Sequence, residues 1–236
     1  MGAAAMAVWH AIPTDWLYAV VGWFAAQWTY SWREHEKRRA DERTRRTALV
    51  AELDWTRWAI AGFMIAIARG QPNVQPRILP ILRWADAEQR RRGFQPLGFA
   101  ELDDAQLVEK VAKLKPHGLS EARSLPTPVL DAVAVQPPFG WSTERIERLL
   151  WLRDKVRLLN EEAERLNRWF QMTFDVQGPL HQRVTENYQI QRSAYIKNLE
   201  PTFNAIRDVV ADLSSAAQVE GRLRREPLAQ PGPDPR

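Results

Sequence analysis

Apolar residues at alternating intervals of three and four positions, between residues 149 and 170, constrain the fold more than any other feature of the chain. They are Leu149, Leu152, Val156, Leu159, Ala163, Leu166 and Phe170. This spacing is typical of the a and d positions of a heptad, where the side chains of one helix pack between those of another. Ser142 suits the N-cap, and Gly178 followed by Pro179 suits the stop. The pattern predicts a helix over 142–177 in an all-α antiparallel bundle with coiled-coil-like packing.

Two further segments predict the other long helices of the bundle. Apolar residues recur at helical spacing over about 47–69 and again over about 180–220, where Pro201 predicts a kink or a break. The stretch WAIAGFMIAIA, residues 58–68, is too short to cross a bilayer alone. We expect it to be buried in the bundle, and a second membrane pass is the alternative.

Residues 70–141 contain nine of the sixteen Pro residues and predict short helices packed on the bundle. The candidates are Pro80 to Arg92 before Gly93, Asp103 or Asp104 to Leu114, and a helix that begins at Thr127–Pro128 and ends before Pro137. The tail PLAQPGPDPR, residues 227–236, has four Pro and no apolar face, which predicts disorder.

The N-terminal segment differs from the rest of the chain, because His10 and Asp15 are its only side chains between Gly2 and Trp32 that could be charged near neutral pH. The 18 residues from Asp15 to Trp32 form a helix of about 27 Å, close to the ~30 Å of a bilayer core. Aromatic residues at its two ends are typical of membrane interfaces, namely Trp16, Trp28, Tyr30 and Trp32. The sequence predicts one transmembrane helix over about 15–32. An interfacial helix and a core helix are the alternatives, since Gln27, Thr29 and Ser31 interrupt the apolar run.

A basic stalk, residues 33–46, follows this helix with seven basic side chains against four acidic ones, an excess of three positive charges. The basic residues are Arg33, Lys37, Arg38, Arg39, Arg43, Arg45 and Arg46. Lys and Arg mark the cytoplasmic flank of a span, and each can attract anionic lipid. We therefore expect the N-terminus outside, the C-terminal domain in the cytoplasm, and these residues in contact with lipid. The Arg, Ala and Pro content favours a bacterial or phage genome, hence the inner membrane of a bacterium.

Small residues on one side of the predicted span favour self-association. Ala19, Gly22 and Ala26 would let two helices approach closely, and Gln27 lies beside them to hydrogen-bond across the contact. A homo-oligomer is therefore an expected state of the span. The alternative is that these residues reflect only the high Ala content of the chain.

No residue pattern in the chain indicates catalysis or metal binding. The absence of Cys excludes thiol nucleophiles and Cys-ligated metals, and the four His residues stand far apart without a ligand motif. Phosphate-binding and nucleophile-elbow motifs are also missing from the sequence. The acidic cluster Glu161, Glu162 and Glu164 falls on heptad positions expected to face water. We predict a protein that is not an enzyme and has no cofactor and no metal.

Together these patterns predict a single-pass membrane protein that acts as a helical interaction or scaffold module. The expected partners are the bilayer, an unidentified protein and a second copy of the chain, and the modest net charge of +4 disfavours nucleic acid. The alternative is a membrane-acting effector, in which self-associating spans disturb the bilayer under the control of the helical domain. The motifs do not identify a family.

Overall fold

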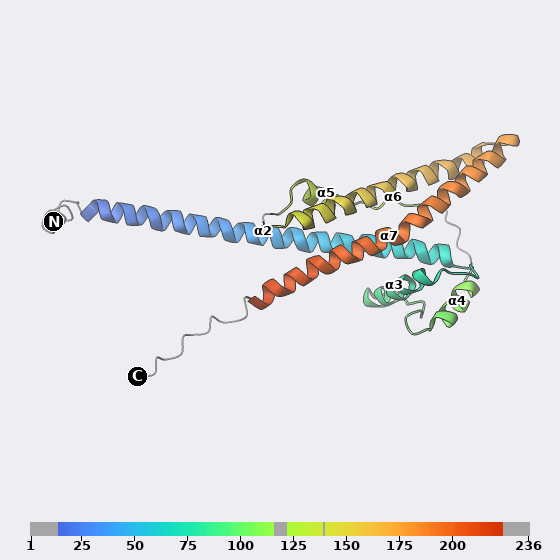
Figure 1. Cartoon of the computed structure of the whole chain (residues 1–236), viewed down its shortest axis with the longest axis horizontal. Coiled ribbons are helices and arrows are strands. Elements are labelled where there is room, and N and C mark those ends of the chain that lie inside the picture. Colours follow the sequence, from blue (N-terminus) through green and yellow to red (C-terminus); the bar gives the residue numbers. More distant parts are fainter. Residues whose placement is uncertain (1–13, 116–121, 139, 224–236) are drawn as a thin grey trace. The chain divides into compact units, whose positions relative to one another are not determined.

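Figure 1 shows the fold as a computed structural model, which describes residues 14–115, 122–138 and 140–223. Over these ranges the chain forms six α-helices and one short 3-10 helix, without any strand. The prediction of an all-α fold is therefore confirmed. The chain divides into two compact units, residues 1–46 and residues 47–236. The tail predicted to be disordered lies outside the described residues.

Helix α2 (Thr14–Ala68) contributes its first part to one unit and its second part to the other. It begins one residue before the predicted start at Asp15 and continues through the basic stalk. Neither Gly nor Pro interrupts residues 23–61, so nothing in that stretch opposes a continuous helix. The helix ends where Gly70 adopts a positive φ of 74° and Pro72 follows.

The prediction of a transmembrane helix over 15–32 is not supported. Among the described residues, no helix combines the length with the mean hydropathy that crossing a bilayer requires. The composition of the segment explains this result. Gln27, Thr29 and Ser31 carry polar groups, and the polar ring atoms of its many Trp and Tyr residues lower the hydropathy further.

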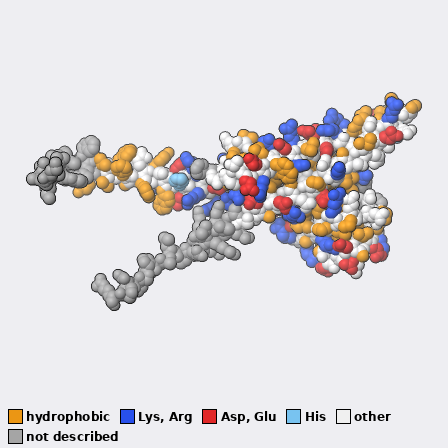
Figure 2. Space-filling view, in the orientation of Figure 1, with side chains coloured by type: hydrophobic (Ala, Val, Ile, Leu, Met, Phe, Trp, Pro, Cys, Tyr) orange, Lys and Arg blue, Asp and Glu red, His pale blue; other side chains and the backbone are white. Residues whose placement is uncertain are grey.

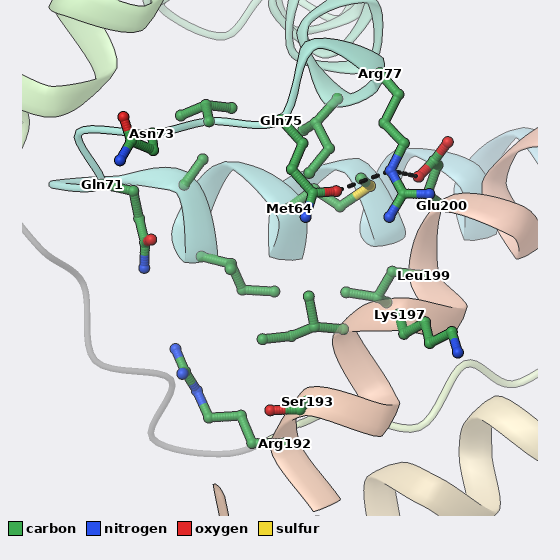
Figure 3. A pocket seen from close by; sticks show the side chains of 15 residues that line it. Met64, Gln71, Asn73, Gln75, Arg77, Arg192, Ser193, Lys197, Leu199 and Glu200 are labelled. Carbon is green, nitrogen blue, oxygen red and sulfur yellow. Dashed lines mark hydrogen bonds and ion pairs between the residues drawn. The ribbon is translucent and has the colours of Figure 1, made fainter. Parts of the chain in front are cut away.

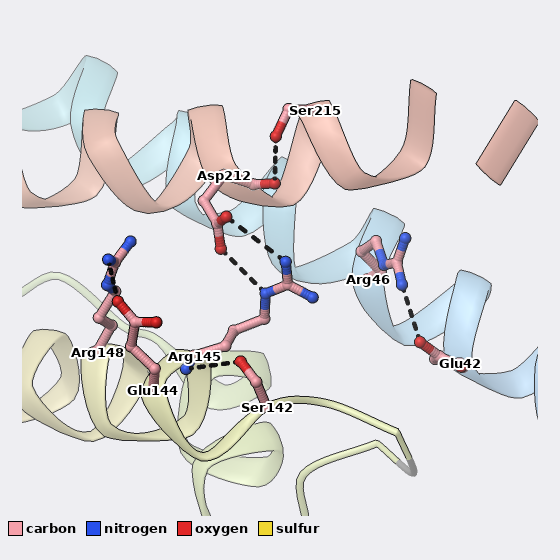
Figure 4. Close-up of polar contacts among 8 residues, drawn as sticks. All are labelled: Glu42, Arg46, Ser142, Glu144, Arg145, Arg148, Asp212 and Ser215. Atoms are coloured by element: carbon pink, nitrogen blue, oxygen red, sulfur yellow. Dashed lines mark hydrogen bonds and ion pairs between the residues drawn. The ribbon is translucent and has the colours of Figure 1, made fainter. Parts of the chain in front are cut away.

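Helices α6 (Thr143–Asp175) and α7 (Pro179–Leu223) form a long antiparallel hairpin in the unit 47–236. As the residue number rises along α6, that of the contacting residue on α7 falls. The contacting pairs are Arg145 with Asp212, Glu162 with Asn198, and Phe170 with Tyr188. Figure 4 shows the first of them, an ion pair with 3.0 Å between Arg145 Nε and Asp212 Oδ2.

The predicted heptad seam lies on the buried side of α6. Six of its seven residues are buried, and Phe170 is half-buried with its ring centroid 5.7 Å from that of Tyr188. The Ser142 Oγ accepts a hydrogen bond from the Arg145 N–H at 3.3 Å, as expected of an N-cap (Figure 4). The prediction for α6 is confirmed, although the helix ends two residues before the predicted position 177.

Pro201 lies inside α7 without breaking it. A proline has no N–H to donate, so the Lys197 carbonyl loses its donor in the helical ladder. The next turn is held by the Thr202 hydroxyl, which donates to the Asn198 carbonyl at 2.8 Å. Of the two predicted outcomes, the break is wrong.

The second part of α2 packs into the core of the unit 47–236. Within the stretch 58–68, five side chains are buried, namely Ile60, Ala61, Met64, Ile65 and Ala68. The Phe63 ring meets Tyr195 of α7 edge-on at 6.5 Å, and the Arg57 guanidinium lies 3.8 Å from the Trp84 ring centroid. Burial of this stretch in the bundle is therefore confirmed.

The Pro-rich middle contains short helices, as predicted. They are η1 (Pro76–Ile78), α3 (Leu79–Arg91), α4 (Asp104–Lys113) and α5 (Pro128–Val135). Helix α4 begins with a capping box, in which the Asp103 carboxylate accepts from the Gln106 N–H and the Gln106 side chain accepts from the Asp103 N–H. The Thr127 side chain makes no capping hydrogen bond at α5. Instead, the Glu52 carboxylate of α2 accepts from the N–H groups of Val129 and Leu130, each at 2.8 Å.

Carboxylate and amide side chains hold the loops of this middle region through hydrogen bonds to the backbone. The buried Asp86 carboxylate of α3 accepts hydrogen bonds from four consecutive backbone N–H groups, those of residues 97–100. On α6, Asn160 pairs with both backbone groups of Leu125, and Asn167 pairs with both backbone groups of Ala122. Asn160 and Asn167 are seven residues apart on α6, which corresponds to about 10 Å along a helix. Ala122 and Leu125 are three residues apart, and three residues of extended chain also span about 10 Å. The two amides can therefore bond to the loop at matching positions.

Candidate functional site

The N-terminal part of α2 exposes large apolar side chains instead of burying them. We call residues 18–32 the apolar segment. Its exposed large side chains are Tyr18, Val21, Trp23, Phe24, Trp28, Tyr30 and Trp32, each between 57% and 78% accessible. Figure 2 shows apolar side chains on the surface along this part of the helix. A contiguous exposed surface of this kind marks a site of contact with another molecule or with lipid.

The exposed side chains project from several sides of the helix. Successive residues of an α-helix are turned by about 100°, so Trp23 and Tyr30 share one side while Phe24 and Trp28 lie on another. A helix that lies flat on a membrane surface would instead collect its apolar residues on one face. The distribution fits a helix surrounded by an apolar environment.

The polar residues of the apolar segment differ in how they are satisfied. The Thr29 hydroxyl donates to the Ala25 carbonyl at 2.7 Å, so the helix itself satisfies this donor. Gln27 is exposed and makes no hydrogen bond to any described residue. The amide of Gln27 is therefore the polar group that an apolar environment would leave in need of a partner.

The small residues predicted to promote self-association are all exposed in this segment. Ala19, Gly22 and Ala26 are accessible, and a Cβ added at Gly22 would meet no atom within 4 Å. No described part of the chain occupies this side of the helix at Gly22. The predicted residues are therefore accessible, and their self-association stays a prediction.

The basic stalk surrounds the helix with positive charge. Five of the predicted lipid-contacting residues are exposed and make no ion pair with a described carboxylate, namely Arg33, Lys37, Arg39, Arg43 and Arg45. At about 100° per residue they are distributed around the whole circumference. We call these five residues the basic collar.

The other two basic residues of the stalk have carboxylate partners. Arg38 is exposed and pairs with Glu34 at 3.3 Å. Arg46 is buried and pairs with Glu42 at 2.8 Å, which removes its side chain from the surface that lipid could reach (Figure 4). Arg46 is therefore not part of the exposed basic surface.

An aromatic patch lies on the surface of the unit 47–236. It consists of Trp55, Trp58, Arg92 and Phe94. The Phe94 ring stacks on Trp58 at 5.8 Å between centroids, and the Arg92 guanidinium lies 5.1 Å from the Trp58 centroid. Trp55 and Phe94 are 52% and 54% accessible. Trp and Arg side chains dominate the energetics of many protein interfaces, so the patch suits a protein contact.

The carboxylate next to this patch is ionised more readily than an ordinary Glu. The Glu88 carboxylate pairs with Arg91 and Arg92, each at 2.6 Å. Hydrogen bonds from Arg91 and Arg92 lower the pKa of Glu88. The pair with Arg92 also fixes the guanidinium that lies over the rings.

One polar side chain of α6 contradicts the prediction from the heptad. Glu162 was expected to face water, but it is buried and accepts two hydrogen bonds from the Asn198 amide at 2.8 and 3.0 Å. Nearby Tyr195 is buried, and burial followed by the charge of Glu162 raises the pKa of its hydroxyl. The hairpin offered a signal, because residues at similar distances from Gly178 on α6 and α7 lie at the same level of the hairpin, as Glu162 and Asn198 do to within about one turn.

The described residues contain no group of three or more His, Cys, Asp or Glu side chains placed to hold a metal ion. His35 and His181 are exposed on separate helices. His10 and His117 lie outside the described residues, as do Trp16's side chain and the other side chains before residue 18.

Comparison of the chain with protein-family models, with curated proteins and with solved structures gives no match.

Proposed function

We propose that the chain is a non-catalytic helical interaction module that the apolar segment holds at a bilayer. The observation that carries this proposal is the exposure of large apolar side chains on several sides of residues 18–32. Water solvates such a surface poorly, whereas the hydrocarbon core of a bilayer covers all sides of a helix at once.

The form of attachment that we propose is a single crossing over about 15–32, in spite of the low mean hydropathy. Thr29 satisfies its own hydroxyl within the helix, and Trp and Tyr favour the membrane interfaces where Trp28, Tyr30 and Trp32 would lie. Both effects make the segment more compatible with a bilayer than its hydropathy suggests.

The basic collar supports the orientation. Its five cations, which make no ion pair with a described carboxylate, follow the apolar segment directly and encircle the helix. This arrangement suits a helix that passes through a surface. By the positive-inside tendency they belong on the cytoplasmic side. The proposal therefore places the unit 47–236 in the cytoplasm, at the inner membrane of a bacterium, with the basic collar at the lipid headgroups.

The aromatic patch supports the role as an interaction module. Its exposed Trp55 and Phe94, with Arg92 between charged and aromatic neighbours, offer a partner protein a preformed contact site. In this proposal the bilayer and the partner protein bind different units of the chain.

Fractionation and reporter fusions test the attachment. In a bacterium, we expect the chain to stay with the membrane after alkaline carbonate, a C-terminal fluorescent protein to be bright and a C-terminal alkaline phosphatase to be inactive. Release of the chain by carbonate would contradict a crossing, and an active phosphatase would contradict the orientation.

A matched pair of Trp substitutions tests whether the apolar segment is the part that attaches. Trp23 and Trp151 have similar accessibility, 57% and 53%, but lie in different units. An Arg in the middle of a span costs about 2.5–3.5 kcal/mol, so Trp23→Arg should release a large share of the chain from the membrane. Trp151→Arg should leave the distribution unchanged.

A membrane-acting effector is the second candidate, because Gln27 and the open side at Gly22 would allow spans to associate. In this case, expression of the full chain should reduce the membrane potential of the host. A membrane potential that stays at its normal value during expression supports the interaction module instead.

A further inference from the structure

A pocket of about 480 Å³ lies in the unit 47–236, apart from the apolar segment and the aromatic patch. Its walls are the C-terminal end of α2, the connection over residues 71–78, and residues 192–200 of α7. Figure 3 shows the side chains of these three segments directed around one space. A volume of this size is typical of pockets that take small molecules, about 300–1,000 Å³.

The floor of the pocket is apolar. Met64, Ile67, Ile196 and Leu199 contribute hydrocarbon surface from α2 and α7. Met64 and Leu199 are buried in the hydrophobic core, whereas Ile67 and Ile196 are only partly buried, so the floor is a partly exposed edge of that core. An apolar ligand body would cover this edge and remove it from water.

The charged side chains of the pocket leave an excess of positive charge. Glu200 is its one carboxylate, and Arg77 binds it at 2.8 Å while also donating to the Gln75 side chain at 2.8 Å. Arg192 and Lys197 make no ion pair with a described residue. Arg192 is half-buried, and Figure 3 shows its side chain extending from α7 toward the segment that carries Gln71.

A half-buried cation without a carboxylate partner is costly beside an apolar surface, unless an anion binds it. Lys197, five residues further along α7, adds a second positive charge to the lining. The amides of Gln71 and Asn73 add neutral hydrogen-bond donors. The site therefore combines one strong anion-binding side chain with an apolar floor.

Two contacts fix the walls of the pocket. The Gly70 N–H donates to the Val111 carbonyl of α4 at 3.0 Å, which holds the start of the connection. The Arg77–Glu200 pair ties the end of the connection to α7. A pocket held in this way needs little rearrangement to accept a ligand.

We propose that this pocket binds a small amphipathic anion, an alkyl carboxylate or alkyl phosphate, with its head group on Arg192 and its chain over the floor. Such an anion could come from a membrane lipid or from a free metabolite of the same chemistry. The proposal does not depend on the function proposed above, because all its residues lie in the unit 47–236.

Photolabelling of the full-length chain in phosphatidylcholine nanodiscs tests the site. The probe is octanoate with a diazirine near the end of its chain, and the labelled peptides are identified by mass spectrometry. We expect saturable labelling of peptides that contain residues 64–78 or 192–200. Octanoate and octyl phosphate should compete, whereas octanol and octyltrimethylammonium should not, because the proposal requires an anionic head group.

Two variants and a matched control locate the binding determinants. Arg192→Ala should raise the probe concentration needed for half-maximal labelling by about tenfold, the value of a typical charge-assisted hydrogen bond. Ser193→Trp should block the pocket, because Ser193 lines it from an exposed position. Arg183→Ala, an exposed Arg of the same helix outside the pocket, should leave the labelling unchanged.

The lipid composition distinguishes the two sources of the anion. If a lipid is the natural occupant, replacing part of the phosphatidylcholine by phosphatidylglycerol should suppress labelling, and if a free anion is the occupant it should not. Either result is compatible with the proposal. Equal labelling of Arg192→Ala and Arg183→Ala, or equal competition by octanol, would overturn it. Neither result would bear on attachment through the apolar segment.

Discussion

The two parts of α2 are similar in composition and opposite in environment. Residues 17–26 and 58–68 are both short runs of apolar residues in the same helix. In the second run Ile60 is fully buried, whereas in the first run Val21 is 61% accessible. An apolar run therefore predicts that a helix will be shielded from water. Other helices of the same chain provide this shielding only where they carry apolar faces of matching spacing.

The comparison also holds for polar groups. In the unit 47–236, several polar groups find specific partners within the chain, as Glu52 does at α5 and Asp86 does at residues 97–100. In the apolar segment, Thr29 bonds only to its own helix and Gln27 bonds to no described residue. The first region thus supplies partners for these polar groups, whereas no described residue supplies one for Gln27 in the second.

The largest expected effect is the loss of a packed side chain from the second run. Ile60→Ala should lower the free energy of unfolding by about 2–5 kcal/mol, because it removes buried hydrocarbon and leaves a cavity. Val21 is also a branched residue, but it is exposed in the run 17–26. Val21→Ala should change the free energy of unfolding by less than about 0.5 kcal/mol.

Urea unfolding of the full-length chain, followed by far-UV circular dichroism, measures both changes. Comparable losses for Ile60→Ala and Val21→Ala would mean that the apolar segment is packed within the chain after all. The comparison on which the proposed function depends would then fail.

Local signals made most helices predictable. Ser142 and Asp103 act at helix starts as expected, and Gly93 and Gly178 adopt positive φ values of 78° and 74° where helices were predicted to stop. These features depend on residues close in sequence, which is why the helix ends agree to within a few residues. The heptad seam succeeded for a related reason, since its period alone fixes the buried face.

Features that join distant segments were not predictable in the same way. The partners of Asp86 are backbone groups 11 to 14 residues away, and a sequence gives no sign of which backbone N–H groups will converge. The pocket needs α2, residues 71–78 and α7 in one place, so no local pattern of residues marks it. The excess of positive charge in the pocket becomes clear only from the ion pair between Arg77 and Glu200, which the sequence does not show.

The next effect concerns the loop that Asn160 holds. Asn160→Ala would leave the N–H and the carbonyl of Leu125 without partners at a buried site, at a cost of about 1–3 kcal/mol. Asn204→Ala is the matched control, because Asn204 lies on α7 and makes no hydrogen bond to a described residue. Urea unfolding measures both. A loss no larger than that of the control would show that the loop contributes little to the packed unit.

A smaller, pH-dependent effect is expected at Glu88. Its pKa is lowered in the folded chain, so its ionised form stabilises the fold above the ordinary Glu pKa of about 4.3. This contribution is complete at pH 7 and is lost as the pH falls through the lowered pKa. Glu88→Gln should cost about 1 kcal/mol at pH 7, a low value because Arg91 is exposed to solvent.

Thermal unfolding of wild type and Glu88→Gln between pH 7 and pH 3 measures this dependence, and the two curves should converge at the acidic end. Glu109→Gln is the control, since Lys113 lowers the pKa of Glu109 on a fully exposed surface. A constant difference between wild type and Glu88→Gln across this pH range would mean that packing, and not charge, accounts for the role of Glu88.

The smallest effect on folding, and the most informative about the apolar segment, is expected at Gly22. A Cβ at this position would meet no atom of the chain within 4 Å, so Gly22→Ile should leave intramolecular packing intact. In a helix, Ile is also more favourable than Gly. Any loss caused by this substitution must therefore arise between molecules, where the bulk of Ile would keep the backbones of two helices apart.

A bacterial two-hybrid assay of the full-length chain in the inner membrane measures this contact, with Val21→Ile as the control on a neighbouring side of the helix. We expect Gly22→Ile to weaken the signal strongly and Val21→Ile to preserve it. If Gly22→Ile retains the wild-type signal, or if the wild type gives none, lipid alone covers the apolar segment. The second part of α2 would then be surrounded by protein and the first part by lipid alone. The effector alternative would lose its support.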